Sequence, residues 1–383
     1  MSKNIPLHAP KFLGNEKKYL NQCIESSWLS SSGKFVKTFE KKISTFTKSK
    51  YAISCINGTS ALHLSLKLAG VKKNDEVIVP TITFIAPINV IKYLGANPIF
   101  MDCDNFLNLN IHKTIEFIKF NTYLKKGNTY NKKTNKRITA LIVVHVFGNP
   151  VDLEKIIQIC KKRNIKIIED SSESLGSFYS RGKLKGKHTG TIGFLGCLSF
   201  NLNKIITAGG GGIILTDSKK LAIKAKYLST QAKDDSIKFV HNSIGYNYGL
   251  TNVHAAIGLA QYENLKKIIN KKRKIHLEYK KKFYLNKNVV LMNSPTYSKS
   301  NFWINIIKVK NNNYFKLLLK KLLMNNIEVR PVWKCNHLQK PYINYQKFKI
   351  TNALNLVNRC ICLPSSYFLS KKQLLKISKL INA

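Results

Sequence analysis

The sequence predicts an α/β protein with a large domain on a mostly parallel sheet and a smaller α+β domain at the C-terminal end. Apolar strand-like runs alternate with helical segments between residues 51 and 216, at the spacing of βαβ units. Runs such as 139–144 are apolar without alternation, as strands buried on both faces are. The 383 residues exceed the usual size of a single hydrophobic core. We therefore expect a large domain over 1–255 and a linking helix plus a small domain over 256–383.

Two amphipathic helices are expected at the N-terminus, over about 15–27 and 34–47. In the second helix, Phe35, Phe39 and Ile43 share one face at the helical period. A polar turn joins the two helices, with the sequence Trp28-Leu29-Ser30-Ser31-Ser32-Gly33.

The first strand, over 51–56, ends at Asn57-Gly58-Thr59-Ser60, where a helix begins. The N-terminus of a helix presents backbone amides and the positive end of its dipole to an anion, and Thr59 and Ser60 add hydroxyl groups. The stretch therefore suggests a phosphate site, although Ser and Thr are also ordinary N-caps.

The strand over 76–80 is followed by Phe84, whose ring either stacks on a planar ligand or packs in the core. The two interpretations carry equal weight from the residues alone. A polar insert over 125–136 is expected to be an exposed loop. The strand over 138–146 ends near His145, which we interpret as a hydrogen-bonded structural histidine and not a catalytic one.

Two strand ends carry the chemistry that the sequence suggests. The apolar run 165–169 ends in Asp170, and α/β sheets place ligands at such strand ends. A second run, 196–200, leads to Lys204 in a loop of small residues that continues into four glycines. Partial burial there would make the amine a better nucleophile toward a carbonyl, although a solvated lysine is an equal alternative on this stretch alone. Pyridoxal phosphate requires such a pair, because an acid keeps its pyridine nitrogen protonated and an amine captures its aldehyde.

The rest of the chain is expected to build the small domain. Long helical periodicity over 252–284 precedes it. Within the remainder we expect a strand over 303–309, a helix over 314–325 and a strand over 327–332.

The net charge of +45 indicates either compositional bias or an anionic partner, such as nucleic acid or a membrane surface. Lysines are spread along the whole chain, and runs such as 271–274 and 280–282 are typical of solvated helix faces. We therefore favour bias and expect no nucleic-acid or membrane partner. Under either interpretation the field attracts anionic, nucleotide-linked substrates.

The eight cysteines lie mostly in apolar runs and no Cys-x-x-Cys pair occurs, so we expect no metal site. Residues 1–10 contain no apolar stretch typical of a signal peptide, and no run of about 18 apolar residues occurs. These features favour a reducing, cytoplasmic location.

Four motifs closely resemble the sugar aminotransferases of the DegT/DnrJ/EryC1/StrS family. They are Glu169-Asp170-Ser171-Ser172-Glu173-Ser174-Leu175-Gly176, Gly190-Thr191-Ile192-Gly193, Leu198-Ser199-Phe200-Asn201-Leu202-Asn203-Lys204 and Gly245-Tyr246-Asn247-Tyr248-Gly249-Leu250-Thr251-Asn252. The resemblance covers almost the whole chain, from Phe12 to Ser366. Segments 229–235, 330–333 and 336–339 most resemble the LegC group, which makes 4-amino sugars for legionaminic-acid-type pathways.

The resemblance implies a transferase of fold type I with pyridoxal phosphate as its cofactor. It implies that Lys204 carries the cofactor and that Asp170 holds its ring nitrogen. Glu173 stands where the family often has Gln, and would contact the phenolic oxygen of the cofactor. The further cofactor-binding positions that it implies are Gly58, Thr59 and Ser60 for the phosphate, Phe84 for the ring, Ser199 for the phosphate, and Asn247, which would reach the cofactor phosphate of a neighbouring subunit.

Candidate substrate contacts are Trp28 and Ser30, with Gly33 in the same turn, and Arg330, Trp333 and His337. For Trp28, residue type alone favours core packing. Arg330 is a candidate because a guanidinium binds the carboxylate of an amino donor or a diphosphate bidentately. Gly249 replaces the arginine that commonly follows Tyr-Asn-Tyr in the family, so no anion contact is assigned there.

These observations lead to transamination as the hypothesis. L-Glutamate would give its amino group, and the acceptor would be a nucleotide-linked 4-keto-6-deoxy-N-acetylhexosamine in legionaminic-type synthesis for bacterial surface glycans. Amination at C3, or of GDP-4-keto-6-deoxymannose as in perosamine synthesis, is the alternative within this class. A sugar dehydratase is disfavoured because those relatives have His in place of Lys204, and a nucleic-acid-binding protein because the chain has no zinc finger or aromatic-interleaved RNA motif. The resemblance also implies a homodimer with shared active sites.

Overall fold

The computed structural model describes residues 4–235 and 237–383. Among these residues the largest element is one mixed sheet. Its strands are β1 (Tyr51–Cys55), β2 (Glu76–Pro80), β3 (Asn97–Met101), β4 (Thr122–Lys125), β5 (Asn128–Asn131), β6 (Arg137–Val144), β7 (Lys166–Asp170), β9 (Leu195–Ser199), β10 (Gly212–Thr216) and β15 (Lys347–Phe348). The main order is β1-β10-β9-β7-β6-β2-β3-β15, with the β4–β5 hairpin beside β6. Every pair from β9 to β15 is parallel, whereas β10 and β5 run against their neighbours. The predicted α/β class and mostly parallel sheet are confirmed.

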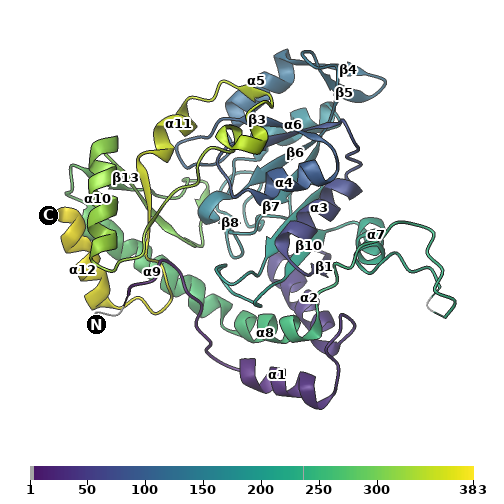
Figure 1. Cartoon of the computed structure of the whole chain (residues 1–383), viewed down its shortest axis with the longest axis horizontal. Helices are drawn as coiled ribbons and strands as arrows, with labels where there is room; N and C mark the ends of the chain where they lie inside the picture. The colour runs from purple at the N-terminus through teal and green to yellow at the C-terminus, as the bar shows by residue number, and fades with distance from the viewer. Residues whose placement is uncertain (1–3, 236) are drawn as a thin grey trace.

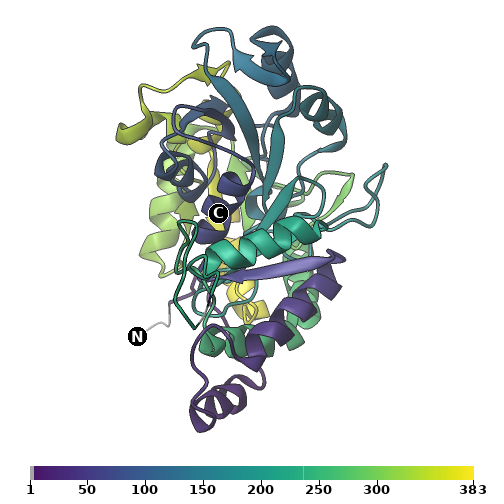
Figure 2. The same ribbon diagram turned by 90° about the vertical axis from the view of Figure 1, so that its right-hand side faces the viewer.

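Helices cover both faces of this sheet (Figures 1 and 2). They are α1 (Glu16–Glu25), α2 (Lys34–Thr47), α3 (Gly58–Leu68), α4 (Ala86–Tyr93), α5 (Ile111–Phe120), α6 (Glu154–Lys162), α7 (Lys219–Ser229) and α8 (Asn252–Glu263). Successive residues of a strand point to opposite faces. Val77 and Val79 of β2 therefore pack with α3 and α4, while Ile78 packs with α5. Helices α2 and α8 cover the same face as α5 and α6, farther along the sheet.

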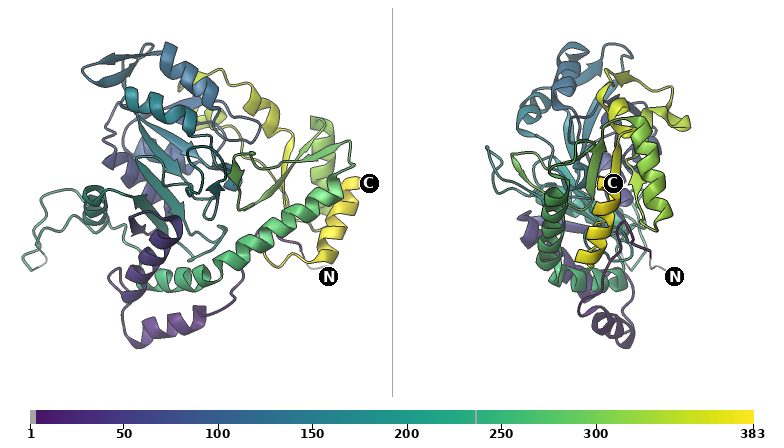
Figure 3. Two further views of the ribbon diagram at one scale, coloured as in Figure 1. Left: turned by 180° about the vertical axis from the view of Figure 1, so that it is seen from behind. Right: turned by 90° about the vertical axis from the view of Figure 1, so that its left-hand side faces the viewer.

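A second, antiparallel sheet lies beside the first, with the order β11-β13-β16-β14. Helices α9, α12 and α10 lie side by side against it (Figure 3) and share one hydrophobic core with its strands. The expected helix over 252–284 is divided at Asn264 into α8 and α9. The elements of this part are α9 (Leu265–Phe283), β11 (Val289–Leu291), β13 (Asn305–Val309), α10 (Asn312–Met324), β14 (Arg330–Pro331), α11 (Asn352–Val357), β16 (Cys360–Leu363) and α12 (Lys371–Asn382).

Some short elements connect the two parts. Near the N-terminus, Ile5 pairs with Ile327, and β15 from the C-terminal part adds an edge strand to the large sheet. A division at residues 255 and 256 stays a prediction. The remaining elements are β8 (Phe178–Tyr179), β12 (Ser298–Lys299) and the 3-10 turns η1 (Val146–Gly148), η2 (Asn336–Leu338) and η3 (Lys340–Tyr342). In the described part of the chain, no helix combines the length and apolar character needed to cross a bilayer.

The polar insert at 125–136 is not the exposed loop that we expected. Most of it belongs to the β4–β5 hairpin, in which Thr129 and Asn131 are buried. The Asn131 side-chain amide donates to Glu76 Oε2 at 2.8 Å, which fastens the hairpin to β2. Polar side chains are buried where they find hydrogen-bond partners, and these partners lie far away in the sequence.

The C-terminal ends of β1, β2, β6, β7 and β9 meet at one edge of the large sheet. Helix α3 begins there directly after β1, and its N-cap Asn57 accepts the Ser60 N–H at 2.8 Å. Parallel α/β sheets place their ligands at this edge, because the loops that leave the strands converge on it.

Candidate active site

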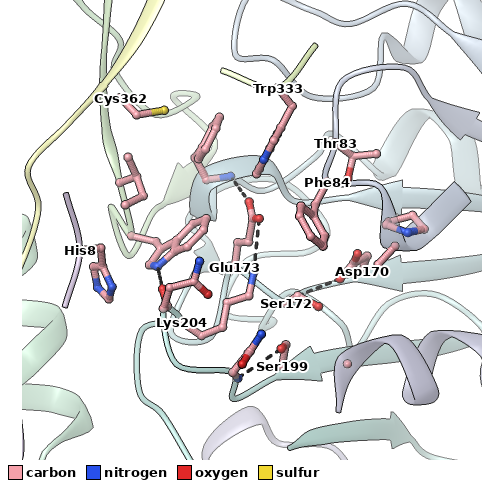
Figure 4. A pocket seen from close by; sticks show the side chains of 18 of the residues that line it. His8, Thr83, Phe84, Asp170, Ser172, Glu173, Ser199, Lys204, Trp333 and Cys362 are labelled. Carbon is pink, nitrogen blue, oxygen red and sulfur yellow. Dashed lines mark hydrogen bonds and ion pairs between the residues drawn. The ribbon is translucent and has the colours of Figure 1, made fainter. Parts of the chain in front are cut away.

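A cavity of about 450 Å³ lies where these strands end (Figure 4). Predicted site residues that line it are Gly58, Thr59, Phe84, Asp170, Glu173, Ser199, Lys204, Arg330 and Trp333. Other residues in its walls include His8, Asn57, Thr83, Phe147, Ser172, Asn203, Trp303 and Glu328.

Lys204 stands in the loop that follows β9, and its side chain is 13% exposed. Its Nζ lies 3.5 Å from Glu173 Oε1 and 4.6 Å from the centroid of the Trp303 ring. Trp303 in turn donates its indole N–H to the carbonyl of Asn203 at 2.7 Å. The amine is therefore largely removed from water and held inside the cavity, as the partly desolvated interpretation predicts.

Asp170 is the last residue of β7, and it pairs with Cys197 of the adjacent strand β9. Its side chain is buried and accepts the Ser172 N–H at 3.0 Å. Burial raises the pKa of this carboxyl, and the hydrogen bonds from Ser172 and the charge of Lys204 only partly oppose the rise. A buried acid of this kind is stabilised as a carboxylate when a cationic group binds beside it.

The residue before it, Glu169, holds this end of the sheet together. Its carboxylate accepts His145 Nε2 at 2.9 Å and the backbone N–H groups of Gly190, Ile192 and Gly193 at 2.8, 2.6 and 2.5 Å. Burial opposes ionisation, but the hydrogen bond from His145 and the amides outweigh it and lower the pKa of Glu169. The prediction that His145 is a satisfied structural residue is confirmed.

Glu173 lies three residues past Asp170, in the turn that follows β7, and its side chain is 4% exposed. Oε1 faces Lys204, and Oε2 accepts the Phe147 N–H at 2.8 Å. Burial raises the pKa of Glu173 to about 7, although Lys204 and the Phe147 amide oppose the rise. Its carboxyl group can therefore exchange a proton near neutral pH.

The start of α3 forms another part of the cavity wall. An α-helix leaves its first amide N–H groups without partners in the helix, so the amides near Gly58 and Thr59 suit an anion. A Cβ on Gly58 would lie 2.8 Å from the Ser199 Cβ, so only glycine allows this close approach. Ser60, which we expected at the phosphate site, does not line the cavity: its N–H donates to the Asn57 side chain and the residue is buried.

Phe84 stands in the loop between β2 and α4, is 55% exposed, and lines the cavity. It is not part of the core, so the core-packing alternative is wrong. Its ring points into the cavity, where it is available to stack on a planar ligand (Figure 4).

Several predicted residues lie away from the cavity of this chain. His337 is buried in η2 and bonds the Thr81 hydroxyl at 2.6 Å through its Nδ1, so it does not line the cavity as we expected. Trp28 is 55% exposed, which contradicts core packing, and neither it nor Ser30 lines the cavity. Asn247 is exposed on the segment that follows α7, also outside the cavity.

Trp303 and Phe147 were missed as site residues. The Phe147 ring stacks on Trp333 with centroids 4.5 Å apart and an angle of 5° between the rings. Phe147 follows the end of β6, and Trp303 precedes the start of β13. A turn with glycine after the apolar run of β6 could have indicated Phe147. Nothing near Trp303 in the sequence indicates that it covers Lys204, because 98 other residues separate them in the chain.

The cavity walls suit pyridoxal phosphate. Lys204 offers an amine for the aldehyde, Asp170 a buried carboxylate for the pyridine nitrogen, Phe84 a ring face, and the start of α3 an anion site. The buried acid opposite a buried amine is the structural observation that fits the cofactor, because each charge gains a partner when the ring binds. No cluster of metal-binding side chains occurs within residues 4–235 and 237–383. The fold and the site define a pyridoxal phosphate-dependent aminotransferase of fold type I.

The chain belongs to the DegT/DnrJ/EryC1/StrS aminotransferase family, whose model matches residues 11–382. It is 37% identical over 381 residues to the GDP-perosamine synthase of Escherichia coli O157:H7, covering 99% of this chain and 98% of that protein. It is 33% identical to Bacillus subtilis EpsN, named as a pyridoxal phosphate-dependent aminotransferase, over 95% of this chain and 92% of EpsN. Its fold matches Helicobacter pylori PseC, an aminotransferase of pseudoaminic acid biosynthesis, with a TM-score of 0.87, 24% identity, and coverage of 99% and 98%. The protein is a pyridoxal phosphate-dependent sugar aminotransferase.

Proposed function

We propose that the enzyme transfers the amino group of L-glutamate to C4 of GDP-4-keto-6-deoxymannose. This perosamine-type reaction is the alternative that the sequence left open. The observation that carries it is the 37% identity, along 99% of the chain, with a protein named GDP-perosamine synthase. A nucleotide diphosphate is also a suitable ligand for a chain with a net charge of +45.

In this proposal Lys204 binds the cofactor through Nζ, and Asp170 keeps the pyridine nitrogen protonated. Pyridoxal phosphate, when bound, supplies the electron sink that stabilises a carbanion beside the amine. With its amine free, Lys204 would act as general base and acid: Nζ would take a proton from the carbon of the amino donor and return one to the sugar carbon. The amides of Gly58 and Thr59 and the Ser199 hydroxyl hold the phosphate, and Phe84 fixes the plane of the ring.

Arg330 and Trp333 are the proposed substrate contacts of this chain. Both line the cavity, and Arg330 forms an exposed ion pair with Glu328 at 3.1 Å. An exposed pair of this kind contributes little stability, so a diphosphate or a donor carboxylate can take the guanidinium from Glu328.

A second candidate is amination of a nucleotide-linked 4-keto-6-deoxy-N-acetylhexosamine, as in legionaminic-type synthesis. The likeness of segments 229–235, 330–333 and 336–339 to the LegC group supports it. Segment 330–333 contributes Arg330 and Trp333 to the cavity, so differences there bear directly on the choice of sugar.

We also propose a cytoplasmic homodimer with shared active sites. The segment after α7 extends away from the rest of the chain (Figure 1) and exposes Ile237, Phe239 and Ile244, which are 87%, 70% and 81% exposed. Apolar side chains exposed together indicate an interaction surface. Asn247 lies at the base of this segment and outside its own cavity, so a second copy is the partner whose cofactor phosphate it would reach.

The acceptor is tested by incubating the purified enzyme with pyridoxal phosphate, L-glutamate and either keto sugar nucleotide. Mass spectrometry then shows whether the keto oxygen has been replaced by an amine. Amination of the GDP sugar alone supports the proposal, and amination of the N-acetylhexosamine alone supports the second candidate. The Lys204→Ala variant is the control for covalent catalysis. A wild-type enzyme that binds the cofactor but aminates neither sugar would contradict both.

A further inference from the structure

The ion pair between Lys204 and Glu173 is an unusual feature of the cavity, because both side chains are almost completely removed from water. Their charged atoms, Nζ and Oε1, lie 3.5 Å apart (Figure 4). The second oxygen of Glu173 accepts the Phe147 N–H at 2.8 Å, so the carboxylate is fastened in the orientation that faces the lysine.

The clamp on Glu173 is built into the backbone. Phe147 adopts φ +53°, a left-handed conformation that costs a non-glycine residue about 1–3 kcal/mol and persists only where its surroundings hold it. Its ring is held by stacking on Trp333, and the carbonyl of Glu173 accepts the Asn301 side-chain amide at 2.9 Å. Glu173 is thus held at two places: its carboxylate by the Phe147 N–H, and its backbone carbonyl by the Asn301 side chain. An ion pair with Lys204 alone would need neither contact.

We propose that Glu173 is the proton acceptor that makes Lys204 nucleophilic. One proton moves from Lys204 Nζ to Glu173 Oε1: an N–H bond breaks, an O–H bond forms, and the pair changes from ammonium and carboxylate to amine and carboxylic acid. The sum of the two charges is zero before and after, so the buried cavity takes up no net charge. The inference rests on the proposed role of Lys204 as the amine that captures the cofactor, and it names where the lysine's proton goes.

Burial gives Glu173 the required affinity for a proton, since it raises the pKa to about 7. Asp170, which faces it from β7, raises the pKa further by its negative charge, while Lys204 and the Phe147 amide lower it. A base near pH 7 exchanges its proton with an adjacent group more readily than an ordinary carboxylate does.

The other ionisable groups around the cavity are less suited to accept this proton. Burial holds the pKa of His8 well below its usual value, and it raises the pKa of the Cys362 thiol, so neither binds or releases a proton near neutral pH. Arg330 and Glu328 pair with each other at the rim. Within the described residues, Glu173 is the acid for which a contact with Lys204 Nζ is seen.

The test measures the reactivity of Lys204 in protein without cofactor. Trace acetic anhydride labels neutral amines, and mass spectrometry of the Lys204 peptide gives the labelling rate between about pH 5 and pH 10. In the wild type the rate should rise up to about pH 7 and then level over the range in which the pair holds a single shared proton, because the distribution of that proton between Nζ and Oε1 does not depend on pH. In Glu173→Gln no acid shares the proton, so the rate should rise about tenfold per pH unit without a plateau near pH 7.

Two further variants keep the test decisive. Glu278→Gln removes an exposed acid that pairs with Lys281 on α9 at 3.7 Å, and it should keep the wild-type profile. Glu173→Asp moves the carboxylate one methylene farther from Lys204 Nζ, so its break should lie at another pH than the wild-type break, and this variant decides the matter if Glu173→Gln does not fold. Identical profiles for the wild type and the folded Glu173 variant would overturn the proposal. Reduction with borohydride after adding pyridoxal phosphate tests the cofactor role separately: a plateau without an adduct on Lys204 refutes that role and leaves the proton transfer standing.

Discussion

Trp303 covers the amine of Lys204, with 4.6 Å between Nζ and the centroid of its ring. The same indole donates its N–H to the carbonyl of Asn203, the residue before the lysine, at 2.7 Å. One side chain therefore fixes the backbone of the lysine loop and contacts the charged end of the lysine. Trp303 stands just before β13 of the antiparallel sheet, whereas Lys204 follows β9 of the large sheet. A residue of the C-terminal part therefore positions the amine at the edge of the large sheet.

Replacing Trp303 should weaken cofactor binding. A desolvated cation–π contact contributes about 1–2 kcal/mol, so Trp303→Ala should raise the Kd for pyridoxal phosphate by about 5–30-fold. Trp303→Phe keeps an aromatic ring but not the N–H donor, and it should lose less. Absorbance titration of the apoenzyme measures both values. Equal affinity in Trp303→Ala and the wild type would show that the contact does not position the lysine.

Asp170→Asn should separate cofactor capture from catalysis. The amide keeps the shape of the side chain but cannot hold a protonated pyridine nitrogen by a charged hydrogen bond, which is worth about 1.5–3 kcal/mol. We expect covalent attachment at Lys204 to persist and kcat to fall by about 10–150-fold. Mass spectrometry after borohydride reduction measures the first, and the transamination rate the second. An undiminished kcat would exclude Asp170 as the partner of the ring nitrogen.

Gly58→Ala tests the close contact between α3 and β9. The added Cβ would lie 2.8 Å from the Ser199 Cβ, so one of the two elements must shift. Overpacking of this kind costs about 1–3 kcal/mol, and we expect both the unfolding midpoint and the phosphate affinity to fall. The double variant Gly58→Ala/Ser199→Gly removes the clash and should recover stability. If urea unfolding shows that the double variant is as unstable as Gly58→Ala, the clash between the added Cβ and Ser199 is not the cause of the lost stability.

Asp102 should make stability depend on acid pH. Its buried carboxylate accepts Lys113 Nζ at 2.5 Å and the N–H groups of Asn352 and Ala353 at 3.0 and 2.8 Å. Burial opposes ionisation, but Lys113 and the amides outweigh it and lower the pKa below the usual 3.8. A group whose pKa is lower in the folded state stabilises the fold above the unfolded value and loses that contribution as the pH falls through the folded one.

Asp102→Asn should therefore destabilise the protein by about 1.5–3 kcal/mol at neutral pH, since it removes the charge that Lys113 and the backbone N–H groups bind. The difference from the wild type should shrink as the pH falls below about 3.8. Urea unfolding from about pH 3 to pH 7 measures it, with Lys113→Met as the variant that keeps the backbone donors. A difference that is independent of pH would show that the charge of Asp102 is not what stabilises the fold.

The residues at strand ends could be predicted because their information is local. A buried apolar run followed by Asp170, and another followed by Lys204 and glycines, show both the element and the polar residue at its end. The direction of a side chain on such an element is not local. Ser60 and His337 were expected at the site and do not line the cavity: Asn57 accepts the Ser60 N–H, and the Thr81 hydroxyl bonds the His337 ring. The β4–β5 hairpin was missed because Glu76, its partner, is 55 positions from Asn131.

By itself, the sequence determined the class of fold, the family, the cofactor, and the pairing of an acid with an amine at neighbouring strand ends. The fold class and the acid–amine pairing follow from periodicity and residue type, whereas the family follows from the resemblance of four motifs, and all of these are local in a linear chain. Only the tertiary structure decided which groups surround that amine: an indole from the second sheet, a second carboxylate clamped by a left-handed phenylalanine, and an arginine at the rim. Their contacts join residues up to about a hundred positions apart, and such distances are set by packing between elements, not by any one segment.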